Sequence, residues 1–369
     1  MLTAFINANI YTGKEKITDK ALIIEDDKIK AIADVDSISN NVKIINCSNC
    51  NIAPGLIDLQ IYGGGGFLFS NKPSVSALES MTNSLLGTGT TGFFVTLATN
   101  SMEIFREAIK VVKEKPHPAV MGLHFEGPYI NPVKRGAHLI QYIRKPERKE
   151  VEEMLKEADG VLRMVTLAPE ICDPEIVKLF EENGVIVSAG HSNATFEEAV
   201  KGYENGISTT THLFNAMSPI HHRATGLPGA AFLSKSAYAS IIADGIHVDF
   251  NTLMISKKIM AERLFLITDA VEEVKDGAYM HVKKEDRFTL PDGTLSGSRL
   301  TLLKAVKNCV EHAGIPLDEA LRMASTYPAR VIKLNDIGKI EPGCKANLVI
   351  FANDYKLKYI FLEGKVVSD

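Results

Sequence analysis

Eight apolar segments, most of them separated by amphipathic helical patterns, constrain the fold of this chain more than any other feature. Near-continuous apolar strands that alternate with helices are typical of a parallel sheet buried on both faces. Eight such units predict an α/β fold, a (β/α)8 TIM-like barrel, with a doubly wound open sheet as the alternative. The segments are IAPGLIDLQI, GFFVTLAT, AVMGLHFEG, LRMVTLAPE, GVIVSAGHS, ISTTTHLFN, YASIIADGIH and LFLITDAV.

Both ends of the chain show a different pattern, in which short runs alternate apolar and polar residues. Examples are KALIIEDDKIKAIA near the N-terminus and ANLVIFANDYKLKYIFLEGKVV near the C-terminus. This alternation, with turn residues between the runs, predicts antiparallel strands. We expect residues 1–50 and 338–369 to form one small β-sandwich domain, with the barrel, residues 51–337, inserted between them. A length of 369 residues suits one barrel plus such a domain.

Composition excludes several classes of partner. A net charge of −4 without a basic cluster gives no electrostatic reason to expect nucleic acid. The five cysteines are odd in number and scattered, which favours a reducing compartment. The N-terminus lacks the pattern of a secretory signal, and the longest uncharged run, residues 80–102, is rich in Gly, Thr, Ser and Asn. We therefore expect a cytoplasmic protein with no membrane partner.

Each apolar segment, read to its end, leads to a polar residue. In a (β/α)8 barrel the functional site lies at the carboxyl face, where residues from several strands meet. Two consecutive segments end on histidine, so two imidazoles should reach the same edge of the sheet. We expect these polar residues to surround one site. They are Gln60, Thr99, Glu126, Glu170, His191, His212, His247 and Asp269.

Glu126, His191 and His212 form a ligand set of the kind that catalytic zinc sites use, with a fourth position open to water. We expect one divalent metal ion per subunit, with Zn²⁺ in first place and Fe²⁺, Mn²⁺ or Co²⁺ as alternatives. Such an ion lowers the pKa of its water to about 7 and supplies hydroxide near neutrality. Each histidine is alternatively an ordinary hydrogen-bonded residue, and Glu126 a partner of Lys134 or Arg135. A Gly-Pro turn directly after Glu126 favours the metal.

Asp269 lies at the end of a strongly apolar segment, where a carboxylate is unexpected unless a nearby group interacts with it. A buried charge must be paired, metal-bound or hydrogen-bonded. We interpret Asp269 as a general base that takes a proton from the metal-bound water and returns it to a leaving nitrogen. The alternative is a helix N-cap.

The segment from residue 213 to residue 229 is long and loop-like. It carries His221, His222 and Arg223, which suit an anionic group such as phosphate. A solvated charged loop is an equal alternative on this pattern alone.

Five motifs in order, HFEGPYINPVKRGAH, SAGHSNATFEEA, THLFNAM, ADGIHVD and LITDA, resemble the N-acetylglucosamine-6-phosphate deacetylase family of the amidohydrolase superfamily. The resemblance covers the whole chain. It implies hydrolysis of the acetamide of an amino sugar phosphate, N-acetylglucosamine 6-phosphate, to glucosamine 6-phosphate and acetate.

On matching positions, Glu126, His191 and His212 resemble the metal ligands of the family and Asp269 its catalytic acid and base. His138 resembles the residue that helps the metal to polarise the scissile carbonyl. Arg223 resembles a phosphate contact that the neighbouring subunit offers, which implies a homodimer. Positions that resemble sugar-binding residues are Ala137, His138, Asn215, Ala216, Asp244, Gly245, Ile246, His247, Leu295, Ser296 and Gly297.

One departure concerns the first strand. Many superfamily members end it on His-x-His and bind a second metal there, whereas this chain has Gln60 and Tyr62. We therefore expect a single metal. Two alternatives stay open, a related hydrolase acting on another acylated amino sugar phosphate or a cyclic amide, and a non-catalytic protein that binds sugar phosphate.

Overall fold

The predicted barrel is present in the computed structural model, which describes residues 2–368. Its eight strands follow chain order around the sheet, and the second to the eighth pair in parallel with one another. A parallel bridge between Ile61 and Ala270 joins the first strand to the last, so the open-sheet alternative is wrong. The strands are β6 (Leu56–Ile61), β9 (Thr90–Ala98), β10 (Val120–Glu126), β11 (Leu162–Leu167), β12 (Ile186–Ala189), β13 (Thr209–Thr210), β14 (Tyr238–Ile242) and β15 (Leu264–Ile267).

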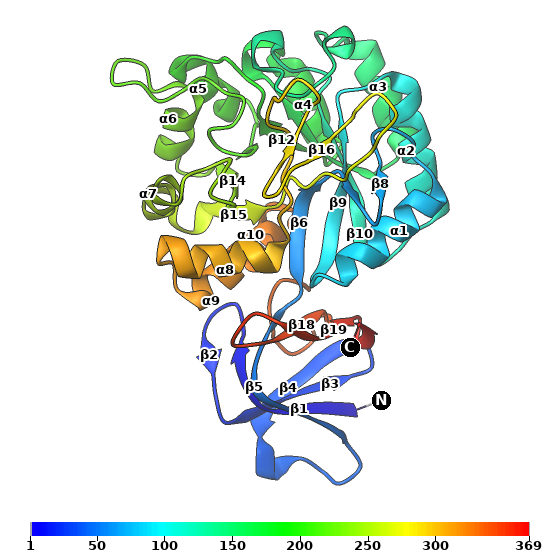
Figure 1. The fold of residues 1–369 in the computed structure, drawn as a ribbon, viewed down its shortest axis with the longest axis vertical. Helices are drawn as coiled ribbons and strands as arrows, with labels where there is room; N and C mark the ends of the chain where they lie inside the picture. Colours follow the sequence, from blue (N-terminus) through cyan, green and yellow to red (C-terminus); the bar gives the residue numbers. More distant parts are fainter. Residues whose placement is uncertain (1, 369) are drawn as a thin grey trace. The chain divides into compact units, whose positions relative to one another are not determined.

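Helices lie around the outside of these strands (Figure 1). Helix α2 shows why, because its buried residues Phe105, Ala108, Ile109 and Val112 recur at helical spacing and form one apolar face. Phe105 stacks on Phe125 of β10 with ring centroids 4.3 Å apart. The helices that follow the first seven strands are α1 (Val75–Leu86), α2 (Met102–Glu114), α3 (Arg148–Ala158), α4 (Pro174–Glu182), α5 (Phe196–Glu204), α6 (Gly226–Leu233) and α7 (Phe250–Met260).

After β15 the chain runs through a long, mostly irregular segment before its next helix. This segment contains the short paired strands β16 (Val282–Lys283) and β17 (Phe288–Thr289). A second short pair, β7 (Gly63–Gly64) and β8 (Phe67–Leu68), follows β6. The helices α8 (Leu302–Ala313), α9 (Leu317–Ala324) and α10 (Thr326–Val331) come next in the chain.

Both chain ends build a second sheet, as predicted, with the order β20-β19-β18-β5-β1-β3-β4 and with β2 paired to β1. Phe5 of β1 and Phe361 of β19 lie 5.0 Å apart although two strands separate them in the sheet. Because neighbouring strands lie about 4.8 Å apart, the sheet must fold over on itself, as in a sandwich. The strands are β1 (Leu2–Tyr11), β2 (Lys16–Ile17), β3 (Lys20–Glu25), β4 (Lys28–Asp34), β5 (Lys43–Pro54), β18 (Leu348–Ala352), β19 (Leu357–Leu362) and β20 (Lys365–Ser368).

One pairing in this sheet differs from the expected antiparallel arrangement. β1 and β5 pair in parallel, because β3 and β4 form a hairpin along one edge of β1 and the chain then returns to its other edge. Residues of both chain ends contribute to one core beneath the sheet, including Ile10, Leu22, Ile52, Leu348 and Ile350.

Internal contacts divide the chain into two compact units. One comprises Met1–Asp58, Asn83–Gly92 and Thr301–Asp369, and the other comprises Leu59–Thr82 and Phe93–Leu300. This division groups α8, α9 and α10 with the chain ends, and the boundaries at residues 51 and 338 stay a prediction. No helix between residues 2 and 368 has both the length and the apolarity needed to cross a bilayer.

Candidate active site

The predicted metal ligands and Asp269 come from four different strands and lie at the same end of the barrel. Glu126 is the last residue of β10, and each of the other three lies two residues beyond the end of its strand. His191, His212 and Asp269 have φ angles of 47°, 32° and 54°. The left-handed region is uncommon for residues other than glycine, and such conformations often occur at functional sites.

One oxygen of the Glu126 carboxylate faces both histidines. Its Oε1 lies 3.0 Å from His212 Nε2 and 3.3 Å from His191 Nε2, and the two Nε2 atoms lie 3.1 Å apart. His191 Nδ1 lies 2.9 Å from the carbonyl of Lys134, which can only accept a hydrogen bond. His191 Nδ1 therefore carries a proton, and its Nε2 is available as a ligand. Within residues 2–368, these three residues form a group that could hold a metal ion.

The other carboxylate oxygen, Oε2, accepts hydrogen bonds from Tyr62 and from His138 Nε2, the latter at 2.9 Å. His138 Nδ1 accepts the backbone N–H of Thr99 at 3.1 Å. The imidazole proton of His138 therefore lies on Nε2, on the side of the pocket. Burial and the neighbouring His191 lower the pKa of His138 to about 4, so it is neutral near pH 7.

Glu126 is buried, and its ionisation follows from its neighbours. Burial alone would raise its pKa, but its contacts with His191, His138 and His212 lower it well below the usual range. The carboxylate is therefore ionised. An anionic oxygen beside two ring nitrogens is the donor set that a divalent first-row metal prefers.

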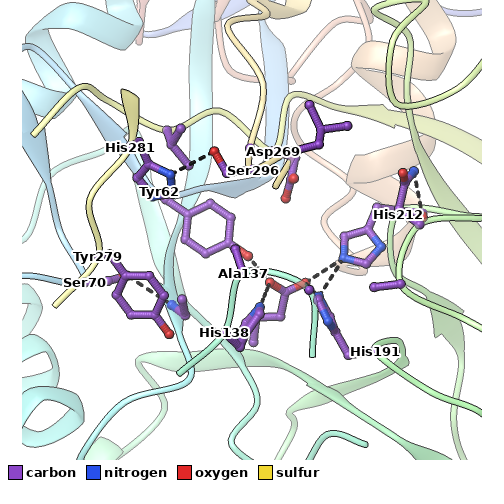
Figure 2. A pocket seen from close by; sticks show the side chains of 18 of the residues that line it. Tyr62, Ser70, Ala137, His138, His191, His212, Asp269, Tyr279, His281 and Ser296 are labelled. Carbon is purple, nitrogen blue, oxygen red and sulfur yellow. Dashed lines mark hydrogen bonds and ion pairs between the residues drawn. The ribbon is translucent and has the colours of Figure 1, made fainter. Parts of the chain in front are cut away.

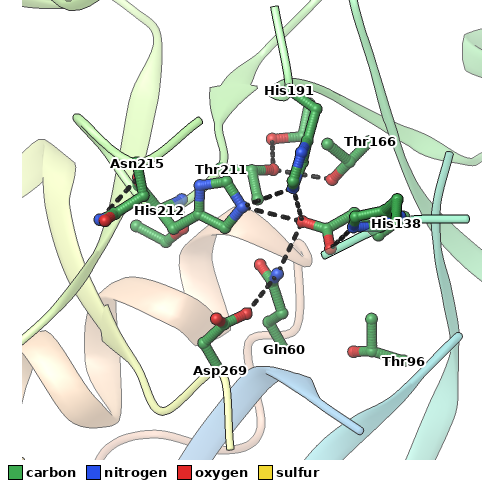
Figure 3. A network of polar contacts seen from close by, with 12 residues as sticks. Gln60, Thr96, His138, Thr166, His191, Thr211, His212, Asn215 and Asp269 are labelled. Atoms are coloured by element: carbon green, nitrogen blue, oxygen red, sulfur yellow. Dashed lines mark hydrogen bonds and ion pairs between the residues drawn. The ribbon is translucent and has the colours of Figure 1, made fainter. Parts of the chain in front are cut away.

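Gln60 links the two carboxylates of the site (Figure 3). Its Nε2 lies 2.9 Å from Glu126 Oε1 and 2.8 Å from Asp269 Oδ1. The residue that departs from His-x-His thus holds Asp269 beside the metal-ligand group.

A cavity of about 320 Å³ opens over this group (Figure 2). Most of the predicted site residues line it. These are Glu126, Ala137, His138, His191, His212, Asn215, Ala216, His247, Asp269, Leu295, Ser296 and Gly297.

Three predicted sugar-binding residues, Asp244, Gly245 and Ile246, do not line this cavity in the described part of the chain. Asp244 instead positions His247. Its carboxylate lies 2.6 Å from His247 Nδ1, and His247 Nε2 lies 2.8 Å from the carbonyl of Ser296. Burial would raise the pKa of Asp244, but hydrogen bonds from His247 and nearby backbone amides lower it.

Arg223 also does not line the cavity in the described part of the chain. It is exposed, on a short turn closed by a bridge between His221 and Ala224. Its Nε lies 3.0 Å from His222 Nε2. Glu170 was expected to face the site but does not line the cavity in the described part of the chain. Its carboxylate instead accepts hydrogen bonds from Asn131, Ser192 and the backbone of Asn193.

Several lining residues were not predicted, notably Leu68, Ser70, Tyr279 and His281. Tyr279 and His281 come from the irregular segment after β15, which has no periodic pattern to reveal them. The glycines after β6 were the available sign that the chain there approaches a ligand, since Leu68 and Ser70 follow them.

Comparisons with known proteins agree with this geometry. The profile of the Amidohydrolase family matches residues 51–367, and that of the NagA composite domain matches residues 3–49. The N-acetylglucosamine-6-phosphate deacetylase of Haemophilus influenzae is 36% identical, over 99% of both chains. The N-acetylgalactosamine-6-phosphate deacetylase of a Shewanella species is 34% identical, over 86% of this chain and 83% of that one.

A solved structure is also similar. The crystal structure of N-acetylglucosamine-6-phosphate deacetylase from Pasteurella multocida superposes with a TM-score of 0.96 and 38% identity, with all of both chains covered. The chain therefore belongs to the amidohydrolase family, and within it to the group of the N-acetylglucosamine-6-phosphate deacetylases.

Proposed function

We propose that this protein hydrolyses the acetamide of N-acetylglucosamine 6-phosphate, which gives glucosamine 6-phosphate and acetate. One observation carries the proposal. Glu126, His191, His212, His138 and Asp269 all line one cavity, in a chain that is similar over its whole length to deacetylases.

Glu126 Oε1, His191 Nε2 and His212 Nε2 would hold one divalent metal ion per subunit, Zn²⁺ in first place with Fe²⁺, Mn²⁺ or Co²⁺ as alternatives. When bound, such an ion polarises a carbonyl and makes water a better nucleophile. A single ion is supported by Gln60 and Tyr62, whose side chains hydrogen-bond Glu126 where His-x-His would otherwise supply further ligands.

His138 would donate a hydrogen bond to the carbonyl oxygen of the acetamide. Thr99 keeps the proton on Nε2, where Glu126 Oε2 accepts it in the structure, and the lowered pKa keeps the ring neutral, so the carbonyl oxygen would take the place of Glu126 as its acceptor. A donor aimed at an oxygen that gains negative charge in the transition state is worth several kcal/mol.

Asp269 would act as general base and then as general acid. Its Oδ1 accepts from Gln60, which also contacts Glu126, so Asp269 is held beside the reacting centre. It would accept the proton of the attacking water and transfer it to the leaving nitrogen as the carbon–nitrogen bond breaks.

The sugar would occupy the part of the cavity lined by Ala137, Asn215, Ala216, His247 and residues 295–297. Asp244 would act there by holding His247, and Gly245 and Ile246 by shaping the turn between them. Arg223 is exposed and outside the cavity of its own chain, which supports a homodimer in which it reaches the phosphate in the neighbouring site. The scattered cysteines support a cytoplasmic location.

Coupled detection of acetate, with elemental analysis of the same sample, tests the proposal. We expect acetate release from N-acetylglucosamine 6-phosphate that is lost on chelation and restored by about one equivalent of metal, and much slower release from the unphosphorylated sugar. A metal-loaded protein that binds the sugar phosphate without releasing acetate would instead be a non-catalytic relative.

The second candidate substrate is N-acetylgalactosamine 6-phosphate, because a relative at 34% identity is named for it. The two sugars differ in the configuration of one hydroxyl. Comparison of kcat/KM for the two 6-phosphates decides between them, and we expect the gluco substrate to be preferred.

A further inference from the structure

The cavity has one apolar side that the proposed contacts to metal, sugar and phosphate do not use. It consists of Tyr62, Leu68, Ala98, Val271 and Tyr279, which line the cavity and belong to one cluster of packed side chains with Phe288. All five are at most 8% exposed. We call these five residues the apolar wall.

The polar atoms of this wall are bound to the protein. The Tyr62 hydroxyl donates to Glu126, and the Tyr279 hydroxyl donates to the carbonyl of Thr99 at 2.5 Å. Nearby, Ser70 Oγ accepts the backbone N–H of Ala98 at 3.0 Å. Aromatic and aliphatic carbon therefore remains to face a ligand. Such a surface offers little to the hydroxyl groups and the phosphate of a sugar phosphate.

The two tyrosines of the wall lie on the opposite side of the centre from the two histidine ligands. Figure 2 shows Tyr62, Tyr279 and Ser70 on one side of His138, and His191 and His212 on the other. An amide carbon has three substituents. With its oxygen toward His138 and its nitrogen toward Asp269, the acyl chain is the substituent left for the remaining side of the cavity.

We propose that the apolar wall is the binding site for the acyl group and that it accepts unbranched chains longer than acetyl. This inference rests on the proposed deacetylase function. All five side chains line the cavity, so an acyl chain longer than acetyl would have further apolar carbon to contact, and burial of each further methylene is favourable. Hydrolysis would break the carbon–nitrogen bond, add the oxygen of water to the acyl carbon and leave a proton on the amine. N-propionyl and N-butyryl glucosamine 6-phosphate would thus yield propionate and butyrate.

Leu68 and Ala98 should determine how much space the acyl chain has. A smaller residue in place of Leu68 would enlarge this space, and a larger one in place of Ala98 would reduce it. The experiment measures kcat/KM for the N-acetyl, N-propionyl and N-butyryl 6-phosphates with the metal-loaded protein. We expect kcat/KM for the propionyl compound to be within about 200-fold of that for the acetyl compound, because one methylene in an apolar pocket changes kcat/KM by about 10–200-fold.

The Ala98→Leu variant should lower the ratio of butyryl to acetyl activity at least about tenfold, and Leu68→Ala should raise it. Leu85→Ala, which removes an equally buried leucine outside the cavity, is the matched control and should leave the ratio unchanged. Because each variant is judged by a ratio within one sample, partial loss of folded protein does not affect the result. Ala98→Val replaces Ala98→Leu if the larger side chain prevents folding.

The outcomes separate the two proposals. If the protein hydrolyses the acetyl compound while both variants leave the ratio unchanged, or if the propionyl compound is rejected more than about 200-fold, the acyl-site inference is wrong and the deacetylase proposal stands. If no N-acyl compound releases its acid, the proposed function fails and the inference fails with it.

Discussion

Two regions of this molecule are rich in histidine, and they differ in the burial and in the contacts of their imidazole rings. His191 and His212 follow buried strands, have side chains 6% and 5% exposed, and converge on Glu126. His221 and His222 lie on an exposed turn with Arg223, and their rings contact each other at 4.0 Å. We call the first region the metal corner and the second the exposed turn.

The difference teaches that residue type alone does not identify a ligand. In the metal corner, the strands fix each backbone, and hydrogen bonds such as that from His191 Nδ1 to Lys134 fix which ring nitrogen is available. In the exposed turn, the side chains contact mainly one another, so their function depends on what binds there. The metal corner is therefore preorganised, and the exposed turn needs a partner.

Replacement of one histidine by alanine in each region tests this comparison, and it has the largest expected effect of our predictions. His212→Ala should weaken metal binding at least about 100-fold, because roughly 10–16 kcal/mol of zinc binding is shared among about four ligands. Acetate release should fall with the bound metal. His222→Ala should leave metal content unchanged. Elemental analysis after dialysis measures both, and equal metal loss in the two variants would contradict the distinction.

Within the metal corner, Asp269 should act on the proton rather than on the metal. Asp269→Asn should lower kcat by roughly 10²–10⁴-fold while metal content stays the same. Asparagine suits the positive φ of this position, so the backbone should be retained. Unchanged kcat would remove Asp269 from the mechanism.

The sequence predicted the barrel because each strand is a separate apolar segment, and such segments are visible without any tertiary information. It also predicted which polar side chains gather, since a residue at the end of a parallel strand must lie at one edge. The convergence of Glu126, His191 and His212 needed only that rule.

Other features could not be predicted in this way. Tyr279 reaches the cavity through an irregular segment that Asn71 anchors with hydrogen bonds to the backbone of Tyr279, and no pattern in the sequence indicates such a contact. The parallel pairing of β1 with β5 depends on the path of the chain after β4. Tyr62 was recognised as a departure, but its bond to Glu126 required the two strands to be placed together.

Tyr62 gives a prediction of intermediate size for the metal corner. Tyr62→Phe removes the donor to Glu126 Oε2 and should weaken metal binding about 10–100-fold, the usual effect of losing a hydrogen bond to a ligand. Tyr203→Phe is the matched control, because that hydroxyl bonds Thr210 outside the cavity. Competition with a chelator measures the affinity, and equal values for the two variants would contradict the assigned role.

The exposed turn should affect substrate binding and little else. Arg223→Ala should raise KM for the 6-phosphate roughly 10–100-fold, since a hydrogen bond to a charged group contributes about 1.5–3 kcal/mol. Metal content and activity on the unphosphorylated sugar should not change. Arg106→Ala, which removes an exposed arginine paired with Glu157, is the control. An unaltered KM for Arg223→Ala would contradict the phosphate contact.

Asp244 and His247 form a third histidine environment, in which hydrogen bonds alone hold the ring. The prediction for this pair has the smallest expected effect. The folded state lowers the pKa of Asp244, so its ionised form stabilises the fold above the unfolded pKa of about 3.9. This stabilisation is lost as pH falls through the lower folded value.

Asp244→Asn should therefore reduce the free energy of unfolding by about 1–3 kcal/mol at pH 7. The difference from the unmodified protein should stay constant down to about pH 5 and shrink below about pH 4. Urea unfolding of both proteins across this range measures it. If the difference in free energy of unfolding grows as pH falls, the Asp244 carboxylate destabilises the fold. Its hydrogen bond to His247 would then not explain how that ring is held, in contrast to the histidines of the metal corner.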